Sequence, residues 1–319
     1  MIDFNKNSDV LVSVIIPTFG RVDFLDDAIK SVVNQTYTNL EIIVCDDNAG
    51  NPKVRSEVKS IVDNYPEVRL IQNANNLGGA LNRNVGIQRA KGELISFLDD
   101  DDVYLPERIE KVVDLYLKHK NEKIGIIYTH YKYTDAHLNI KGKCCIYPTD
   151  NPLYLHMCGC LCATSQWTVP SYVFDEVGLF EPSPSKQDSI MLLKILGKYN
   201  KALCVPECLS LYRAHSLNVR ISNNCLKHIE GEKKYASFLK HYYHLLTKSQ
   251  TDYVEACIAK RMLLDYSNLH EYKHVWQCLI VIIKKLGITG LGYRDLLFAI
   301  ASPNFYGKIY RFFKSISLV

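Results

Sequence analysis

The stretch Glu93–Arg108, ELISFLDDDDVYLPER, runs from an apolar segment directly into four consecutive aspartates. At an effective dielectric near 20, two carboxylates about 6 Å apart repel each other by roughly 3 kcal/mol. A folded chain therefore retains such a cluster where water dilutes the charge or where a cation binds. The apolar residues that precede the aspartates are typical of a short buried strand, so the charge is expected at a strand end.

Two earlier apolar segments end in the same way. Val12–Ile16, VSVII, is stopped by Pro17, and the segment EIIVC at 41–45 runs into Asp46 and Asp47. Ligands of open parallel sheets bind beyond the carboxyl ends of the strands. We therefore expect a binding site where these strand ends and the four aspartates meet.

Helical periodicity separates the apolar segments. Apolar side chains recur every three or four residues over 22–33, 54–65 and 79–90. Strands that alternate with helices predict an α/β fold with a doubly wound, mostly parallel sheet and right-handed crossovers. From about 221 onward the pattern is helical, so we expect an α/β domain over 1–220 and a helical C-terminal region over 221–319.

The composition is that of an ordered globular protein, with 319 residues, 47% hydrophobic and 23% charged. The net charge of +4 is small and the expected site is acidic, so a nucleic-acid partner is disfavoured. The longest apolar run, VWQCLIVII, stops at Lys284, short of the roughly 18 residues of a spanning helix. The N-terminal residues lack the pattern of a signal peptide, and we expect a cytoplasmic protein.

Eleven cysteines are interpreted as small core residues rather than disulfides, because no secretory leader is expected. His156, Cys158, Cys160 and Cys162 alternate in LHMCGCLCATS. If this segment is an extended strand, the four side chains share one face and cannot surround a tetrahedral ion. We therefore expect no metal site there.

The four aspartates suit a divalent cation better. Carboxylates spaced i and i+2 just after a strand can turn toward one pocket, and hard oxygen ligands suit Mg²⁺ or Mn²⁺. Such ions keep water and take substrate phosphates as their remaining ligands. A solvated acidic loop is the alternative, and the position directly after a buried strand, on the same edge as Asp46, favours the cation.

Two long stretches resemble the family 2 glycosyltransferases, whose fold is called GT-A. They are VSVIIPTFGRVDFLDDAIKSVVNQTYTNLEIIVCDDNA at 12–49 and NNLGGALNRNVGIQRAKGELISFLDDDDVYLPERI at 75–109. The resemblance implies a Rossmann-like sheet flanked by helices, with a nucleotide-sugar half over about 1–110 and an acceptor half over about 111–220. It is weaker over 160–215 and does not reach the last hundred residues.

This resemblance assigns the nucleoside to Pro17, Thr18, Phe19 and Asp46. A carboxylate can accept the N3–H of uracil, and an aromatic ring can pack on the base or the ribose. A turn role for Asp46 and simple packing for Phe19 are the alternatives. Arg83, in ALNRNVGI, matches a basic position near the donor, with a surface helix arginine as its alternative.

The family's D-x-D motif falls on Asp99, Asp100 and Asp101. The resemblance makes Asp101 the main ligand of Mn²⁺ or Mg²⁺, while Asp99 and Asp100 orient the ribose and the water shell of the ion. Asp102 is interpreted as a turn or helix-entry residue with the mildest effect on activity. His215 is expected to complete the metal site or to contact phosphate, unless it is structural.

The segment EVGLFEPSPSKQDSIMLLKIL resembles the region that holds the family's general base, which is Asp188 here. The alternative is a structural aspartate, since the helix dipole favours negative charge in the first turn of a helix. The segment LSLYRAHSLNVR resembles one that closes over the donor in the family, with Tyr212, Arg213 and His215. The acceptor is assigned to Trp167, Tyr212 and Arg213. The aromatic face of Trp167 suits a sugar ring, and core packing is its alternative.

These assignments imply an inverting enzyme. It would move a hexosyl group from a nucleoside diphosphate sugar, with UDP favoured, to a hydroxyl of a saccharide or lipid-linked oligosaccharide acceptor in cell-surface polysaccharide assembly. A sugar-phosphate nucleotidyltransferase is disfavoured because PTFGRVD holds one Gly and one Arg, too few for a triphosphate loop. A non-catalytic nucleotide-sugar binding protein is the other alternative.

The C-terminal segment 303–319 has its own pattern. It contains NFYGKIYRFFKSISLV, in which aromatic and aliphatic residues fall at helical spacing with three basic residues between them. Such a helix can lie on an anionic bilayer, which would place the enzyme at the inner face of the cell membrane. Docking on its own domain, or on a second subunit in a homodimer, is the alternative.

Overall fold

The computed structural model describes residues 10–214, 224–287 and 290. The described chain forms two compact units. The first unit contains 10–155, 160–182 and 187–214, and the second contains 156–159, 183–186 and the described residues from 224 onward. The boundary expected near 220 falls among residues outside the description, and that division of the chain stays a prediction.

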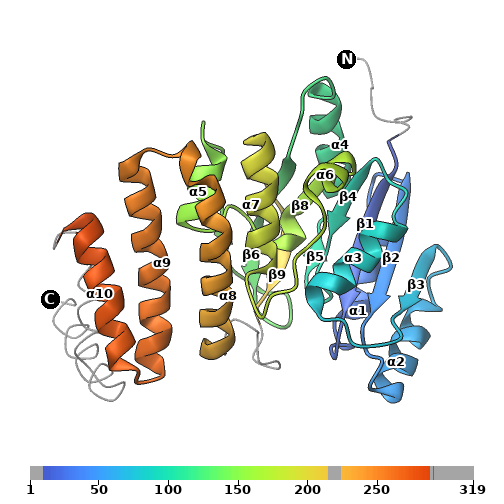
Figure 1. The fold of residues 1–319 in the computed structure, drawn as a ribbon. Coiled ribbons are helices and arrows are strands. Elements are labelled where there is room, and N and C mark those ends of the chain that lie inside the picture. The colour runs from blue at the N-terminus through green and yellow to red at the C-terminus, as the bar shows by residue number, and fades with distance from the viewer. Residues whose placement is uncertain (1–9, 215–223, 288–289, 291–319) are drawn as a thin grey trace, which may run out of the picture. The chain divides into compact units, whose positions relative to one another are not determined.

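The first unit is built on one nine-stranded sheet (Figure 1). Its strands are β1 Val12–Thr18, β2 Leu40–Asp46, β3 Val68–Gln72, β4 Leu94–Phe97, β5 Val103–Tyr104, β6 Ile126–Thr134, β7 Ile140–Cys144, β8 Trp167–Pro170 and β9 Ala202–Arg213. They lie in the order β3-β2-β1-β4-β8-β6-β9-β5, with β7 on β6. The strands β1 to β4 pair in parallel, and β8 joins β4 in the antiparallel sense.

Helices flank this sheet, so the predicted α/β architecture is confirmed. They are α1 Leu25–Val33, α2 Pro52–Val62, α3 Gly79–Arg89, α4 Arg108–Lys118, α6 Tyr172–Val177 and α7 Gln187–Tyr199, with a 3₁₀ turn, η1, at Thr164–Gln166. A further helix, α5 Pro152–Cys158, begins in the first unit and ends in the second. Successive side chains of a strand point to opposite faces. Val14 and Ile16 of β1 therefore lie in the core formed with α1 and α4, whereas Ile15 faces α3.

The second unit is helical, with α8 Cys225–Leu239, the 3₁₀ helix η3 Lys240–Leu245, α9 Lys248–Asn268 and α10 Tyr272–Leu286. A capping box between Thr247 and Gln250 starts α9. Glu232 of α8 is fully buried and is paired with Arg261, at 2.7 Å, and with Lys186, at 2.8 Å. These two cations hold the pKa of Glu232 below its usual range, although burial opposes them.

The segment that contains His156 and Cys158 was expected to be an extended strand. His156 and Cys158 lie in the helix α5, so the assumption of an extended strand was wrong; Asn151 accepts a hydrogen bond from Tyr154 N at 3.0 Å and starts this helix. Within the described residues, no group of three or more His, Cys, Asp or Glu side chains is placed to hold a metal ion.

The helices of the described chain are each too short or too polar to cross a membrane.

The approach of α3 to the sheet depends on Gly86. A Cβ at this position would lie 2.5 Å from Ile15 Cγ2 and 3.1 Å from Cys45 Sγ. Replacing an exposed helical glycine by alanine usually stabilises a helix by about 1 kcal/mol. At Gly86 overpacking reverses the sign, so we expect Gly86→Ala to lower the free energy of unfolding by about 1–3 kcal/mol in urea titrations. Gly50→Ala, where a Cβ meets nothing within 4 Å, is the control; equal stability of the two variants would contradict the expected packing.

Candidate active site at the carboxyl ends of the strands

The four aspartates form a tight turn directly after β4. Asp102 N donates to Asp99 O at 3.0 Å, and Leu98 N donates to Ile15 O of the neighbouring strand. The four residues differ in exposure: Asp100, Asp101 and Asp102 are buried, although 12% of the Asp101 side chain stays exposed, whereas the Asp99 side chain is 27% exposed. The turn thus contains two deeply buried carboxylates, a third that is nearly buried and a fourth that is partly exposed.

Asp100 and Asp101 share one counter-ion, Arg21. Its Nη2 lies 2.7 Å from Asp100 Oδ1, and its Nη1 lies 2.5 Å from Asp101 Oδ2. Burial raises the pKa of Asp100 to about 7, although Arg21 opposes the rise. Burial disfavours the charged form of Arg21, but the surrounding aspartates outweigh this effect and raise its pKa. Sequence reasoning missed Arg21, and its only signal was a basic residue close behind the end of the first strand.

Asp102 fastens the turn to two other elements. Ser165 Oγ of η1 donates to Asp102 Oδ2 at 2.5 Å, and Arg213 N at the end of β9 donates to Oδ1 at 3.0 Å. The same serine hydroxyl accepts a hydrogen bond from Asp99 N at 3.1 Å. Burial raises the pKa of Asp102 well above its usual range. Asp102 therefore has more contacts than a turn alone requires.

Arg213, assigned to the acceptor by the sequence, is buried beneath this turn. Its Nε donates to Asp101 O at 2.9 Å and its Nη1 to Ala136 O at 2.8 Å, while Nη2 pairs with Asp27 at 2.8 Å. Through these contacts Arg213 links β9 to α1 and to the aspartate turn. A direct contact with an acceptor stays a prediction.

Asp99 faces the helix α3. Arg83 Nη2 lies 2.6 Å from Asp99 Oδ1, and an added Cβ at Gly79 would meet both Arg83 Nη1, at 3.3 Å, and Gln187 Oε1, at 3.2 Å. The first turns of α3 and α7 are therefore neighbours. The structure thus brings Arg83 and Asp99 together and places the start of α7 beside the first turn of α3, while a role for these residues at the donor stays a prediction.

The helix α7 begins with the pair Gln187 and Asp188. Asp188 is partly exposed in the first turn, and its Oδ1 accepts a hydrogen bond from Ser189 N at 2.8 Å. Hydrogen bonds from α3 hold the segment that precedes this helix. Asn84 of α3 exchanges two hydrogen bonds of 2.9 Å each with the backbone N–H and C=O of Phe180. Sequence reasoning missed Asn84, whose partner is 96 residues away.

The residues expected at the nucleoside are divided between surface and core. Phe19 is 56% exposed just beyond β1, whereas Pro17 and Thr18 are buried in that strand. Asp46 is fully buried: its Oδ1 accepts from Asn48 and its Oδ2 from Gln72 Nε2 at 2.9 Å. A contact between Asp46 and a base therefore stays a prediction and requires one of these internal bonds to be exchanged.

The neighbouring Asp47 was not singled out by sequence reasoning, yet it organises the loop before α3. It is buried and accepts hydrogen bonds from Leu77 N, Gly78 N and Asn73 Nδ2 at 2.8–3.1 Å. Gly78 has φ +79°, a conformation that side chains rarely adopt. Asp47 thereby sets the position from which α3 presents Arg83.

The residues expected at the acceptor lie in different surroundings. Trp167 is 1% exposed, with its ring stacked 6.1 Å from that of Phe180, so its contact with a sugar stays a prediction that needs this side chain to become exposed. Tyr212 lies in an aromatic cluster with Tyr131 and Tyr133, at 5.6 and 5.8 Å between ring centroids. His215 lies outside the described residues.

Asp99 and Asp101 fit a divalent cation in their chemistry, since both supply carboxylate oxygens and their side chains keep 27% and 12% exposure. Two protein carboxylates are typical of an ion that takes its other ligands from water and phosphate. Arg21 and Arg83 already pair with these carboxylates, so an ion would share them with two guanidinium groups.

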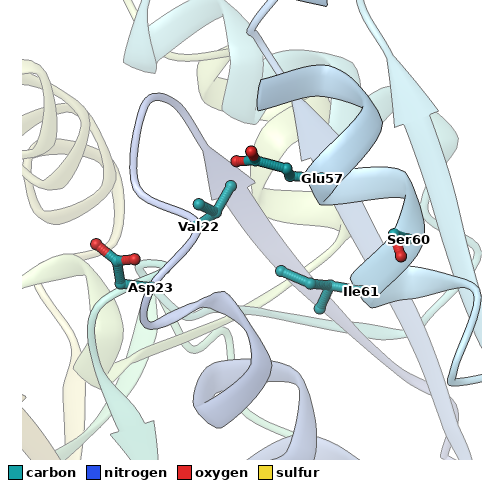
Figure 2. Close-up of a pocket in the computed structure, with 5 residues that line it drawn as sticks. All are labelled: Val22, Asp23, Glu57, Ser60 and Ile61. Atoms are coloured by element: carbon teal, nitrogen blue, oxygen red, sulfur yellow. The ribbon is translucent and has the colours of Figure 1, made fainter. Parts of the chain in front are cut away.

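A separate hollow of about 290 Å³ lies between α2 and the loop before α1. Figure 2 shows its lining residues, Val22, Asp23, Glu57, Ser60 and Ile61. None of the residues predicted for the site lines this hollow, and we assign no ligand to it.

The sheet and the helices that flank it have the GT-A fold of glycosyltransferases, and solved structures share this fold. S. aureus TarS 1–349 in complex with UDP-GlcNAc superposes with a TM-score of 0.60 at 14% identity, over 89% of this chain and 82% of that one. The mannosyltransferase PcManGT from Pyrobaculum calidifontis, in complex with GDP-Man and Mn²⁺, gives 0.57 at 12% identity, over 97% and 80%.

The chain belongs to glycosyltransferase family 2, whose model, Glycosyl transferase family 2, matches residues 13–151. Escherichia coli WfaP, a UDP-Glc:alpha-D-GlcNAc-diphosphoundecaprenol beta-1,3-glucosyltransferase, is 30% identical over 215 residues, covering 66% of this chain and 79% of WfaP. WfgD from the same species, described in the same words, is 33% identical over 135 residues, covering 42% and 51%. An uncharacterized glycosyltransferase of Rickettsia felis is 33% identical over 201 residues, covering 58% of this chain but 31% of its own length. The match thus spans only about a third to a half of several curated relatives.

Removing the Asp102 carboxylate should destabilise the protein. In Asp102→Ala the Arg213 N–H and the Ser165 hydroxyl lose a buried acceptor, so we expect the free energy of unfolding to fall by about 1–3 kcal/mol. Asp63→Ala removes a carboxylate that is 59% exposed and should change stability by less than about 0.5 kcal/mol. Urea titrations followed by circular dichroism measure both, and an Asp102→Ala protein as stable as the control would contradict the anchoring role.

Proposed function

We propose that the protein transfers a hexosyl group, with inversion, from a nucleoside diphosphate sugar to a hydroxyl of a saccharide acceptor. The observation that carries this proposal is the clustering at the strand ends. Asp99 and Asp101 present carboxylates whose side chains are 27% and 12% exposed, Arg21 and Arg83 pair with them, and α7 begins beside Arg83. This set has the charges that a diphosphate leaving group requires.

The donor would bind with its diphosphate at this cluster. Arg21 and Arg83 would donate hydrogen bonds to phosphate oxygens, and the exposed ring of Phe19 would pack on the nucleoside. Asp99 and Asp101 would hold Mn²⁺ or Mg²⁺, which supplies positive charge to the departing diphosphate. UDP-glucose is the first donor to test, because WfaP and WfgD use it by name.

Asp188 is the proposed general base. In the transfer, the acceptor oxygen forms a bond to the anomeric carbon while the bond from that carbon to the diphosphate breaks. Asp188 takes the hydroxyl proton as the oxygen attacks. A single displacement on the face opposite the leaving group inverts the anomeric configuration, so an α-linked donor gives a β-linked product.

The proposed acceptor is a saccharide carried on a lipid diphosphate. WfaP and WfgD act on GlcNAc-diphosphoundecaprenol by name, and this is the acceptor class to test first. The Tyr131, Tyr133 and Tyr212 cluster offers aromatic faces of the kind that pack against sugar rings. The enzyme would then work at the inner face of the cell membrane in polysaccharide assembly.

A donor screen tests the reaction class. The full chain is incubated with UDP-glucose, UDP-GlcNAc and GDP-mannose, with Mn²⁺ and a GlcNAc-diphosphate lipid, and the phosphate products are separated. Release of UDP together with a glycosylated lipid is expected. Release of pyrophosphate would indicate a nucleotidyltransferase instead, and donor binding without any release would indicate a binding protein.

The role of Asp188 has its own test. Asp188→Asn keeps the shape of the side chain but cannot take a proton, so we expect turnover to fall by about 10²–10⁴ while the KM for the donor changes little. Asp175→Asn is a matched control, because Asp175 is also an acidic residue in the first turn of a helix and is exposed. Near-normal turnover of a folded Asp188→Asn protein would overturn the assignment.

The metal is tested by titration. If Asp101 holds Mn²⁺, Asp101→Asn should raise the Mn²⁺ concentration for half-maximal UDP release by tenfold or more, because a neutral amide binds a hard cation poorly. Asp63→Asn, at an exposed ion pair, should leave it unchanged. Full activity after EDTA treatment in metal-free buffer would contradict metal dependence and leave charge neutralisation to Arg21 and Arg83.

A further inference from the structure

The helix α10 carries a strip of exposed apolar side chains. Tyr272, Trp276, Ile280 and Ile283 are 40%, 56%, 48% and 39% exposed. Their spacing of four, four and three residues places them along one side of the helix. The strip runs almost the full length of α10, which spans Tyr272–Leu286.

This strip is separate from the face with which α10 contributes to its own unit. Val275, Leu279 and Ile282 are at most 3% exposed and pack in a core with residues such as Leu263 and Tyr266 of α9. Among the described residues, α10 thus has one apolar face that packs in its own unit and a second that stays exposed. A contiguous exposed apolar surface can mark an interaction site.

Positive charge lies beside the exposed apolar face of α10. Successive residues of an α-helix are 100° apart, so Lys273 and Lys284 fall close together on the side next to Ile280. Both lysines are exposed, and the α10 sequence YKHVWQCLIVIIKKL contains no acidic residue. The acidic residues of α9 have other partners than Lys273 and Lys284: Asp252 and Glu255 pair with Lys285 of α10, at 2.8 and 2.5 Å, and Asp265 pairs with His228 of α8.

We propose that this face of α10 docks flat on the surface of an anionic lipid bilayer. Aliphatic side chains beside a tryptophan, a tyrosine and lysines match the interfacial region, where rings lie at headgroup level and lysines reach anionic lipids. The proposal assigns lipid contact to described residues of α10 and does not rest on the proposed sugar transfer.

A second copy of the chain fits the face less well. Lysine is depleted in protein–protein interfaces, whereas tyrosine and tryptophan are enriched. A two-fold symmetric dimer through this face would also bring Lys273 and Lys284 of the two copies toward each other, because both copies use the same surface. The like charges favour a negatively charged surface over a second copy.

Vesicle binding of the full chain tests the proposal. We expect co-sedimentation with vesicles of phosphatidylglycerol and phosphatidylcholine, and at least tenfold weaker binding to phosphatidylcholine alone. Trp276→Ser combined with Ile280→Ser should reduce binding to the anionic vesicles at least tenfold, and Lys273→Glu combined with Lys284→Glu should do the same. The matched control, Leu226→Ser with Leu245→Ser, alters residues that are 58% and 48% exposed on other elements and should bind as the unchanged chain does.

Fluorescence supplies a direct readout. The chain has two tryptophans, of which Trp167 is 1% and Trp276 56% exposed, so a lipid-dependent blue shift reports on Trp276. Circular dichroism confirms that each variant is folded. The proposal is overturned if the full chain ignores anionic vesicles, or if the Trp276 and Ile280 variant binds as well as the unchanged chain, which would move the contact elsewhere, for example to 303–319. A dimer that only this variant dissociates, without vesicle binding, would identify a second copy as the occupant.

Discussion

Mutual repulsion among the four aspartates of one turn is the constraint on which the strand-end site depends. Each carboxylate is stabilised by a partner from a different part of the chain. Arg21 lies between Asp100 and Asp101, Arg83 pairs with Asp99, and Asp102 accepts from Ser165 and from the backbone of Arg213. Because these partners come from the end of β1, from α3, from η1 and from the end of β9, the charge of the turn joins four elements that are distant in sequence. The acidic run therefore shapes the site as well as supplying its chemistry.

The four carboxylates differ in how deeply they are buried, and this difference separates their roles. Burial raises the pKa of Asp100 to about 7 and that of Asp102 well above its usual range, because burial disfavours the charged form of both carboxyl groups. The side chains of Asp99 and Asp101 are less deeply buried, at 27% and 12% exposure, and are the better placed pair to meet a ligand. Arg21 and Arg83 stabilise this arrangement without a ligand, since each of these two carboxylates already has a cation beside it. A diphosphate with its own cation could enter such a site by exchanging partners, with no need to create an uncompensated charge.

The fold was largely predictable from the sequence, because buried strands of a parallel sheet are short β-branched runs, and VSVII and EIIVC have no other simple interpretation. Arg83 pairs with Asp99, and the donor-side role that the family resemblance gives to both residues stays a prediction. The depth of each aspartate was not predictable, since DDDD has no internal pattern and the turn alone decides which side chains point inward. Arg21 and Ser165 were missed for a related reason: their partners are 80 and 63 residues away, and nothing local to either residue reveals the contact.

In the helical unit, α10 has more apolar residues than its core uses. In α10, Val275, Leu279 and Ile282 suffice to pack the helix on its neighbours, and a polar strip at positions 276, 280 and 283 would serve the fold equally well. Exposed aliphatic and indole groups carry a risk of aggregation. Lys273 and Lys284 beside them reduce that risk through charge repulsion between molecules. A helix that combines an unburied apolar strip with such a safeguard is better explained by a contact outside its own fold than by packing within it.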